Sequence, residues 1–283
     1  MLLPIQKFLV VARKTLNSYR HAMRIFLWAA LLLAAVLRAC ALLDQTLWLD
    51  EGYSVLFSRV PVRSIVLSAG LDTNPPLGNA FFHFWCQMVG YAPVLMRLPG
   101  VAASLLSLAL LWRLLQRMVP LPSAVFVVLF KSVSLYDVLY SRQLRVYPYA
   151  ELLLVFSWIC LQRYASGRSF RYAALWAACS AAAIHLHYFC ALVVFATSLL
   201  ALIGLKEQRR SIVAAIAILC LLVAPLGLPL AQQVIVHRSF VGWIPEPGAG
   251  VLLVVAYQFC GYSLLVLGAA LVLLFAASVS YTH

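Results

Sequence analysis

Two adjacent carboxylates, Asp50 and Glu51, are the residues of this chain whose type and position best suit chemistry. The chain has only eight acidic residues among 283, and these two follow the first long apolar run. Carboxylates at a membrane surface are only partly hydrated, so they require a partner or a function. We therefore take Asp50 as the candidate catalytic centre. Successive helical residues are about 100° apart, so Glu51 would point elsewhere and bind an arginine or a metal ion.

A structural role for Asp50 is the alternative, because an aspartate in this position can cap a helix that begins at Glu51. The same sequence, from Asp50 to Val60, has helical character and ends at Pro61. We favour catalysis, because acidic residues at membranes are usually functional.

The composition determines which kind of protein must position these groups. The chain is 65% hydrophobic and 10% charged, with a mean hydropathy of +0.97, against about 45–50% apolar and 25% charged in soluble domains. These values exclude a soluble globular protein and predict an all-α, polytopic membrane protein. The net charge of +13 does not indicate a nucleic-acid partner, because the basic residues are scattered between apolar runs and act as topology signals. The seven cysteines lack the spacing of metal ligands.

The apolar runs predict about eight spans in a single domain over residues 1–283. Residues 1–24 form a basic cytoplasmic segment, and residues 44–92 form a loop on the outer face. The predicted spans are 25–43, 93–118, 121–139, 147–164, 172–187, 188–205, 211–232 and 250–277. This order places the basic clusters that include Arg113, Arg163 and Arg209 on the cytoplasmic side.

The outer loop 44–92 contains a second predicted helix, from Leu77 to Tyr91. Asn74 is a favourable N-cap, and the prolines that follow it suit a first helical turn. About 15 residues are too few for a span, which needs roughly 20, so we expect this helix to lie in the outer interface.

Six short motifs occur in order along residues 25–250. They are WLDEGYS (48–54), NPPL (74–77), LMRLP (95–99), YSRQLRVY (140–147), HYF (187–189) and WIP (243–245). Together they resemble the GT-C membrane glycosyltransferases. The nearest group is the protein O-mannosyltransferase and aminoarabinose-transferase-like group (glycosyltransferase family 39), which includes the Rgt-type lipopolysaccharide enzymes.

The resemblance implies a transferase that moves a sugar from a polyprenyl-phosphate donor to a hydroxyl of a lipid, glycan or protein acceptor. It implies an active site on the outer face of a bacterial inner or plasma membrane, with Asp50 as the catalytic base. Because polyprenyl phosphate leaves as a stable anion, one carboxylate suffices, with inversion at the sugar carbon. The donor phosphate needs positive charge, for which Arg145 is the first candidate and Arg97 and Arg38 are the others.

Five further residues are candidates for binding substrate or a divalent metal ion: Glu51, Asp72, Asn74, Gln143 and His187. Gln143 stands where the family usually has a glutamate, which leaves metal dependence open. Asp72 could instead be a turn residue, and His187 could be an interfacial histidine with protein partners. Arg38 could extend its charged end to the membrane interface.

Besides Gln143, two further features depart from the family pattern. Lys131 lies within a predicted span, at a cost on the order of 2.5–3.5 kcal/mol unless it is paired. The chain also ends after its last predicted span, where family members continue, which indicates a short variant or a C-terminally truncated chain.

An inactive remnant or partner subunit therefore stays open as an alternative function, as does a transporter or flippase. A transporter would have polar residues and broken helices at the bilayer midplane, whereas Arg38, Asp137 and Glu151 are predicted nearer the outer ends of their spans.

Overall fold

The computed structural model is helical throughout its described secondary structure. It describes residues 21–23, 25–40, 42, 46–167 and 169–237, together with positions 248, 250, 251, 254, 255 and 257. A first helix, His21–Ala39, precedes eleven α-helices, α2 to α12, and three short 3-10 helices in this part of the chain.

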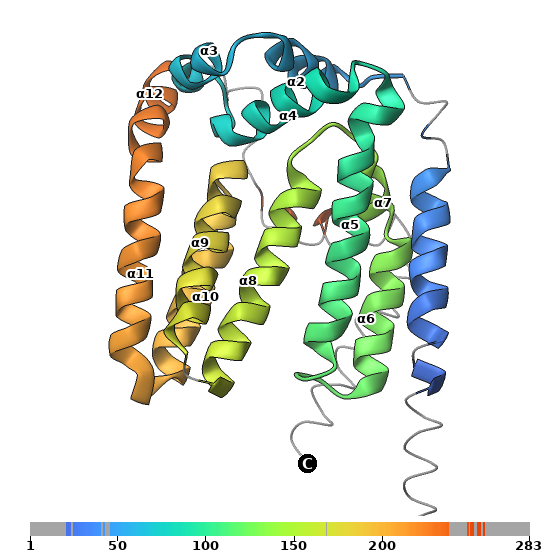
Figure 1. Ribbon diagram of the computed structural model, residues 1–283, viewed down its shortest axis with the longest axis vertical. Coiled ribbons are helices and arrows are strands. Elements are labelled where there is room, and N and C mark those ends of the chain that lie inside the picture. Colours follow the sequence, from blue (N-terminus) through green and yellow to red (C-terminus); the bar gives the residue numbers. More distant parts are fainter. Residues whose placement is uncertain are drawn as a thin grey trace, which may run out of the picture.

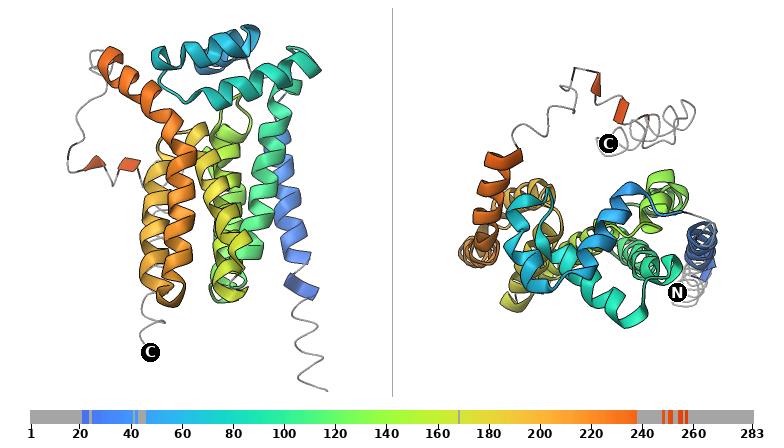
Figure 2. Two further views of the ribbon diagram at one scale, coloured as in Figure 1. Left: turned by 60° about the vertical axis from the view of Figure 1, so that its left-hand side comes forward. Right: turned by 90° about the horizontal axis from the view of Figure 1, so that it is seen from above.

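The long helices run side by side as an antiparallel bundle, which Figures 1 and 2 show from three sides. Along the chain the bundle helices after the first are α5 (Pro93–Leu115), α6 (Leu121–Val133), α7 (Leu135–Ser141), α8 (Tyr147–Gly167), α9 (Phe170–Leu186), α10 (Cys190–Gly204), α11 (Arg209–Val223) and α12 (Gly227–His237). Helices α6 and α7 form one rod that is bent by 53° at Ser134. Local sequence signals agree with these boundaries, since α5 and α6 both begin with proline in the first turn.

Three short helices, α2 (Leu49–Arg59), α3 (Val62–Leu67) and α4 (Pro76–Val89), lie across one end of the bundle (Figures 1 and 2). The predicted helix of the outer loop is therefore present in α4, which has 14 residues. Its N-cap is Pro75 and not Asn74, and the helix begins at Pro76, one residue before the predicted Leu77. The helix ends at Gly90, whose φ of 82° is a conformation that glycine adopts without a Cβ clash.

Two hydrophobic cores hold the bundle together. One lies among α4, α8, α9, α10 and α11 and includes the fully buried Trp176 and Tyr164. The other joins the first helix to α5 and α6, where Ala30 and Ala34 pack with Leu108, Trp112 and Val128. Small alanine side chains allow these helices to approach closely, as is typical of helix interfaces in membranes.

Three helices in the described part of the chain are long and apolar enough to cross a membrane: His21–Ala39, Pro93–Leu115 and Lys206–Ile235. The number is four if the bent pair of α6 and α7 counts as one span. The prediction of eight spans is therefore wrong. Helices α9 and α10 have only 17 and 15 residues, fewer than the roughly 20 that a span needs. The predicted span 250–277 lies almost entirely outside the described residues.

Candidate functional site

Asp50 lies in the first turn of α2, with its side chain 66% exposed. Helix α2 begins at Leu49 with Trp48 at the N-cap position, so Asp50 does not cap a helix that begins at Glu51. The Asp50 carboxylate faces one cation, since its Oδ2 lies 3.7 Å from Nη2 of Arg145. A negative charge is favourable at this end of the helix. Asp50 is thus an accessible carboxylate that a substrate hydroxyl could approach.

Arg145 belongs to the loop between α7 and α8, and only 16% of its side chain is exposed. Its Nη2 donates a hydrogen bond to the hydroxyl of Tyr147 (3.4 Å), and its guanidinium lies 5.6 Å from the centre of the Tyr147 ring. Its Nε–H is buried and has no hydrogen-bond partner among the described residues. Arg145 therefore places a positive charge beside the exposed Asp50, where it can attract an anion.

Glu51 has a different environment from its neighbour Asp50, because its side chain is fully buried in an ion pair with Arg97. Arg97 donates from Nε to Oε1 (2.8 Å) and from Nη2 to Oε2 (2.7 Å). The two carboxylate oxygens also accept the backbone N–H groups of Leu144 (2.8 Å) and Trp48 (3.0 Å). Both oxygens are thus occupied by protein donors, and Glu51 joins α2 to α5 and to the 142–146 loop.

The 142–146 loop is held by close packing as well as by Glu51. A Cβ added at Gly100 of α5 would stand 2.9 Å from the backbone oxygen of Ser141, and one added at Gly78 of α4 would overlap Val146. Arg142 donates from Nη1 to the backbone oxygen of Cys40 (2.6 Å), beyond the end of the first helix. Four parts of the chain therefore determine where Arg145 stands.

An aromatic group lies next to Arg145. The ring of Tyr147 contacts the ring of Tyr140 edge-on at 4.8 Å and the ring of His187 at 5.4 Å. The N–H of Phe189 donates to Nδ1 of His187 (3.3 Å), so a neutral His187 carries its proton on Nε2. Burial, together with the charge of Arg145, lowers the pKa of His187. His187 is therefore neutral near pH 7, with a donor that a substrate oxygen can use.

The other sequence-predicted residues lie in different places. Asp72 and Asn74 belong to the turn before α4, where Asp72 accepts the N–H of Thr73 (2.6 Å) and the side-chain amide of Asn79 (2.9 Å). Gln143 is buried within the 142–146 loop. Arg97 and Arg38 are both buried, Arg97 against Glu51 and Arg38 against neutral oxygens of the bundle. The structure thus brings together Asp50, Arg145 and His187.

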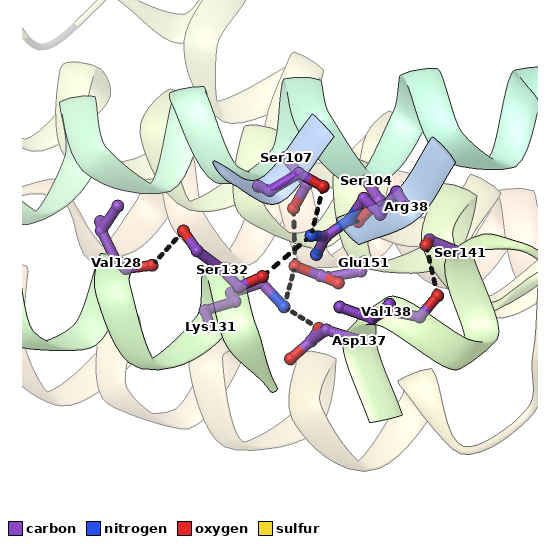
Figure 3. Close-up of polar contacts among 11 residues, drawn as sticks. Arg38, Ser104, Ser107, Val128, Lys131, Ser132, Asp137, Val138, Ser141 and Glu151 are labelled. Carbon is purple, nitrogen blue, oxygen red and sulfur yellow. Dashed lines mark hydrogen bonds and ion pairs between the residues drawn. The ribbon is translucent and has the colours of Figure 1, made fainter. Parts of the chain in front are cut away.

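Sequence reasoning missed a second polar cluster, at the break between α6 and α7 (Figure 3). There Lys131 forms ion pairs with Asp137 and with Glu151 (2.9 Å), and Arg38 donates to the backbone oxygen of Ser132 (3.1 Å). The clearest sequence signal was Lys131, since a lysine inside an apolar run needs partners. Its partners are not recognisable from spacing, because residues six positions apart do not face each other on a straight helix.

A divalent metal ion does not fit the described donor groups. No three histidine, cysteine, aspartate or glutamate side chains gather among the described residues where they could hold one. Glu51 uses both oxygens for protein N–H groups, and Asp50 faces Arg145. We therefore assign no chemical step to a metal ion.

Comparison of the chain with protein-family models, with curated proteins and with solved structures finds no match in any of the three.

Proposed function

We propose that the protein is a GT-C-type membrane glycosyltransferase that uses a polyprenyl-phosphate sugar donor. The observation that carries this proposal is the exposed Asp50 carboxylate, which lies 3.7 Å from the guanidinium of Arg145. A hydroxyl acceptor needs such a proton acceptor, and a phosphate leaving group needs such a cation. The resemblance of the WLDEGYS and YSRQLRVY motifs to that family supports the same assignment, since they supply these two residues.

The proposed reaction uses Asp50 and Arg145 in one step. The acceptor oxygen forms a bond to the anomeric carbon of the sugar while Asp50 takes the hydroxyl proton. The bond between that carbon and the phosphate oxygen breaks, and its electron pair leaves with the polyprenyl phosphate. Arg145 stabilises the charge that develops on the phosphate, and the sugar carbon is inverted. The acceptor is a lipid, glycan or protein hydroxyl.

The proposed orientation follows from the two ends of the bundle. Basic residues gather at the end opposite α2–α4, where α5 and α8 end and α11 begins: Arg113, Arg117, Arg163, Lys206, Arg209 and Arg210. Positive residues favour the cytoplasmic side. We therefore place the N-terminus in the cytoplasm and Asp50 on the outer face of a bacterial inner or plasma membrane.

The test is transfer by purified protein from a panel of radiolabelled polyprenyl-phosphate sugars. We expect wild-type protein to move label to an acceptor, and Asp50→Asn to lose on the order of 10²–10⁴-fold in rate, the usual contribution of a general base. Arg145→Ala should weaken donor binding, and Arg145→Lys should restore part of it because the charge returns. A parallel set of reactions with EDTA, which removes divalent ions, tests whether a metal ion contributes to transfer.

Near-native transfer by Asp50→Asn would remove Asp50 as the base, and unchanged donor affinity in Arg145→Ala would remove Arg145 from the phosphate site. Absence of transfer with every donor, in folded protein, would favour the inactive or partner-subunit alternative.

A transporter is the second candidate, and the break between α6 and α7 favours it. Discontinuous helices with charged side chains at the break are typical of secondary transporters, and Lys131, Asp137 and Glu151 lie at this one. Uptake of labelled substrate by proteoliposomes, without transfer to an acceptor, would distinguish a transporter from a glycosyltransferase.

A further inference from the structure

Two arginines meet on one tyrosine at the end of the bundle opposite α2–α4, where α8 ends and α9 begins (Figure 1). Arg163 belongs to the last part of α8, and Arg171 and Tyr172 belong to the first turn of α9. Nη1 of Arg163 and Nη2 of Arg171 both donate to the hydroxyl oxygen of Tyr172, each at 3.3 Å. The two guanidinium groups also lie 5.6 Å and 4.8 Å from the centre of the Tyr172 ring. We name these three residues the arginine–tyrosine group.

The positive charge of this group is not balanced by a carboxylate. Neither arginine forms an ion pair with an acidic residue in the described part of the chain. Contact with the tyrosine ring attracts each guanidinium, but the ring is neutral and the two like charges repel each other. The neighbouring turn before α11 adds basic residues, Lys206, Arg209 and Arg210, and one acidic residue, Glu207. This end of the bundle therefore has positive charge in excess.

The arginine–tyrosine group also has the donors that a phosphate requires. A guanidinium carries five N–H donors, and each of these two uses one of them on the Tyr172 oxygen. The Tyr172 hydroxyl accepts both bonds and can still donate its own proton. Arg171 is exposed and Arg163 is half-buried, so a ligand can reach both. A phosphate placed on the group would receive charge-assisted hydrogen bonds from both arginines and would balance their charge.

The surface that continues from the group along α9 is apolar. Arg171, Leu175 and Ala178 are exposed and follow the spacing i, i+4, i+7, so they lie along one face of the helix. Leu175 is 43% exposed, and Phe170, next to Arg171, is 44% exposed. A cation at the end of an apolar helix face fits a molecule with an anionic head and an apolar tail. A free phosphate would use only the arginines.

We propose that Arg163, Arg171 and Tyr172 bind the phosphate of one anionic phospholipid, in the membrane leaflet at this end of the bundle. Basic sites between membrane helices are suited to anionic head groups, and each arginine near a membrane surface attracts such lipids. The acyl chains of the lipid lie along the face of α9 that carries Leu175 and Ala178. Binding is non-covalent, and the lipid joins the end of α8 to the start of α9. The site lies at the opposite end from Asp50 and does not depend on the proposed transferase activity.

Native mass spectrometry of the purified full-length protein in detergent tests the proposal. The probes are phosphatidylglycerol and phosphatidylcholine with the same acyl chains. We expect wild-type protein to bind one phosphatidylglycerol more tightly than phosphatidylcholine. The double variant Arg163→Gln/Arg171→Gln should bind phosphatidylglycerol on the order of 10–30-fold more weakly, because each arginine contributes about a factor of five. Tyr172→Phe, which removes the hydroxyl that both guanidinium groups contact, should lose a smaller part of the affinity.

Arg59→Gln is the matched control. Arg59 also lies over a tyrosine ring, 4.8 Å from the centre of that of Tyr91, but it is a single arginine at the other end of the bundle. Its substitution should leave the affinity for phosphatidylglycerol unchanged. Size-exclusion chromatography establishes that each variant is folded, and Arg171→Gln alone, at an exposed side chain, serves if the double variant does not fold.

Three outcomes would overturn the proposal. The first is unchanged affinity for phosphatidylglycerol in the double variant, and the second is an equal loss in Arg59→Gln, which would indicate attraction by net charge without a site. The third is displacement of the lipid by inorganic phosphate at the same concentration as the lipid. That result would show that the arginine–tyrosine group binds a free phosphate and that the apolar face of α9 contributes nothing.

Discussion

Asp50 and Glu51 are neighbours in the chain, but α2 gives them opposite environments. The turn of the helix directs Glu51 inward, where Arg97 and two backbone N–H groups bind it, and leaves Asp50 exposed beside Arg145. Of the two partners that the sequence left open for Glu51, an arginine or a metal ion, the structure has the arginine. Glu51 therefore joins α2, which carries Asp50, to the 142–146 loop, which carries Arg145.

This difference predicts unequal effects of two isosteric substitutions. Glu51→Gln puts an amide where four donors converge and leaves Arg97 buried without its counter-charge, which should destabilise the protein by about 3–5 kcal/mol. Asp50→Asn, at an exposed side chain, should change stability by less than about 0.5 kcal/mol. Chemical denaturation of both variants in the same detergent measures the difference. Equal stability of the two variants would show that the Glu51–Arg97 pair does not hold the site together.

At the scale of elements, the candidate site is built where α4 and α5 approach the 142–146 loop. Both approaches occur at glycines, Gly78 and Gly100, whose missing side chains make room for the loop. At Gly100 the close neighbour is the backbone oxygen of Ser141, at the end of α7, and at Gly78 it is the side chain of Val146, so neither position has room for a Cβ. The position of Arg145 thus depends on residues of other elements that carry no chemistry of their own.

Gly100→Ala tests that dependence. The new Cβ would stand 2.9 Å from the backbone oxygen of Ser141, which cannot rotate away. The substitution should cost about 1–3 kcal/mol of stability and weaken donor binding with it. Gly52→Ala is the matched control, because nothing lies within 4 Å of its Cβ, and alanine in a helix should stabilise α2 by about 0.5–1 kcal/mol. Thermal unfolding of the two variants should therefore shift in opposite directions; a shift in the same direction would contradict the packing argument.

Local signals predicted individual helices better than they predicted how helices pair. The end of α2 before Pro61 and the short α4 across the bundle end follow from proline and from length. The partners of Lys131 could not be predicted, because Asp137 reaches it only across a bend and Glu151 comes from another helix. The number of spans was overestimated because α9 and α10 are too short to cross a membrane, and α8, with 21 residues, is not apolar enough. The partner of Arg38 could not be predicted either, because Ser132 is 94 residues away along the chain.

At the scale of the whole molecule, the two ends of the bundle differ in charge and in structure. One end carries α2–α4 with the exposed Asp50, and the other carries the basic turns before α9 and α11. A large number of big apolar side chains lie exposed between the ends, among them Phe195 at 70% and Leu221 at 73%. Exposed apolar surface of this kind requires a lipid environment or a partner. The charge difference between the two ends, together with the exposed apolar surface between them, predicts one orientation of the bundle in a membrane.

Labelling of single cysteines tests the orientation. In a background whose seven native cysteines are replaced, Thr73→Cys would lie in the exposed turn before α4, and Glu207→Cys in the exposed turn before α11. If α2–α4 face outward, an impermeant maleimide should label Thr73→Cys in intact spheroplasts and should label Glu207→Cys only after permeabilisation, because positive residues stay in the cytoplasm. The opposite pattern would put Asp50 on the cytoplasmic face, and equal labelling of both positions in intact spheroplasts would contradict a spanning bundle.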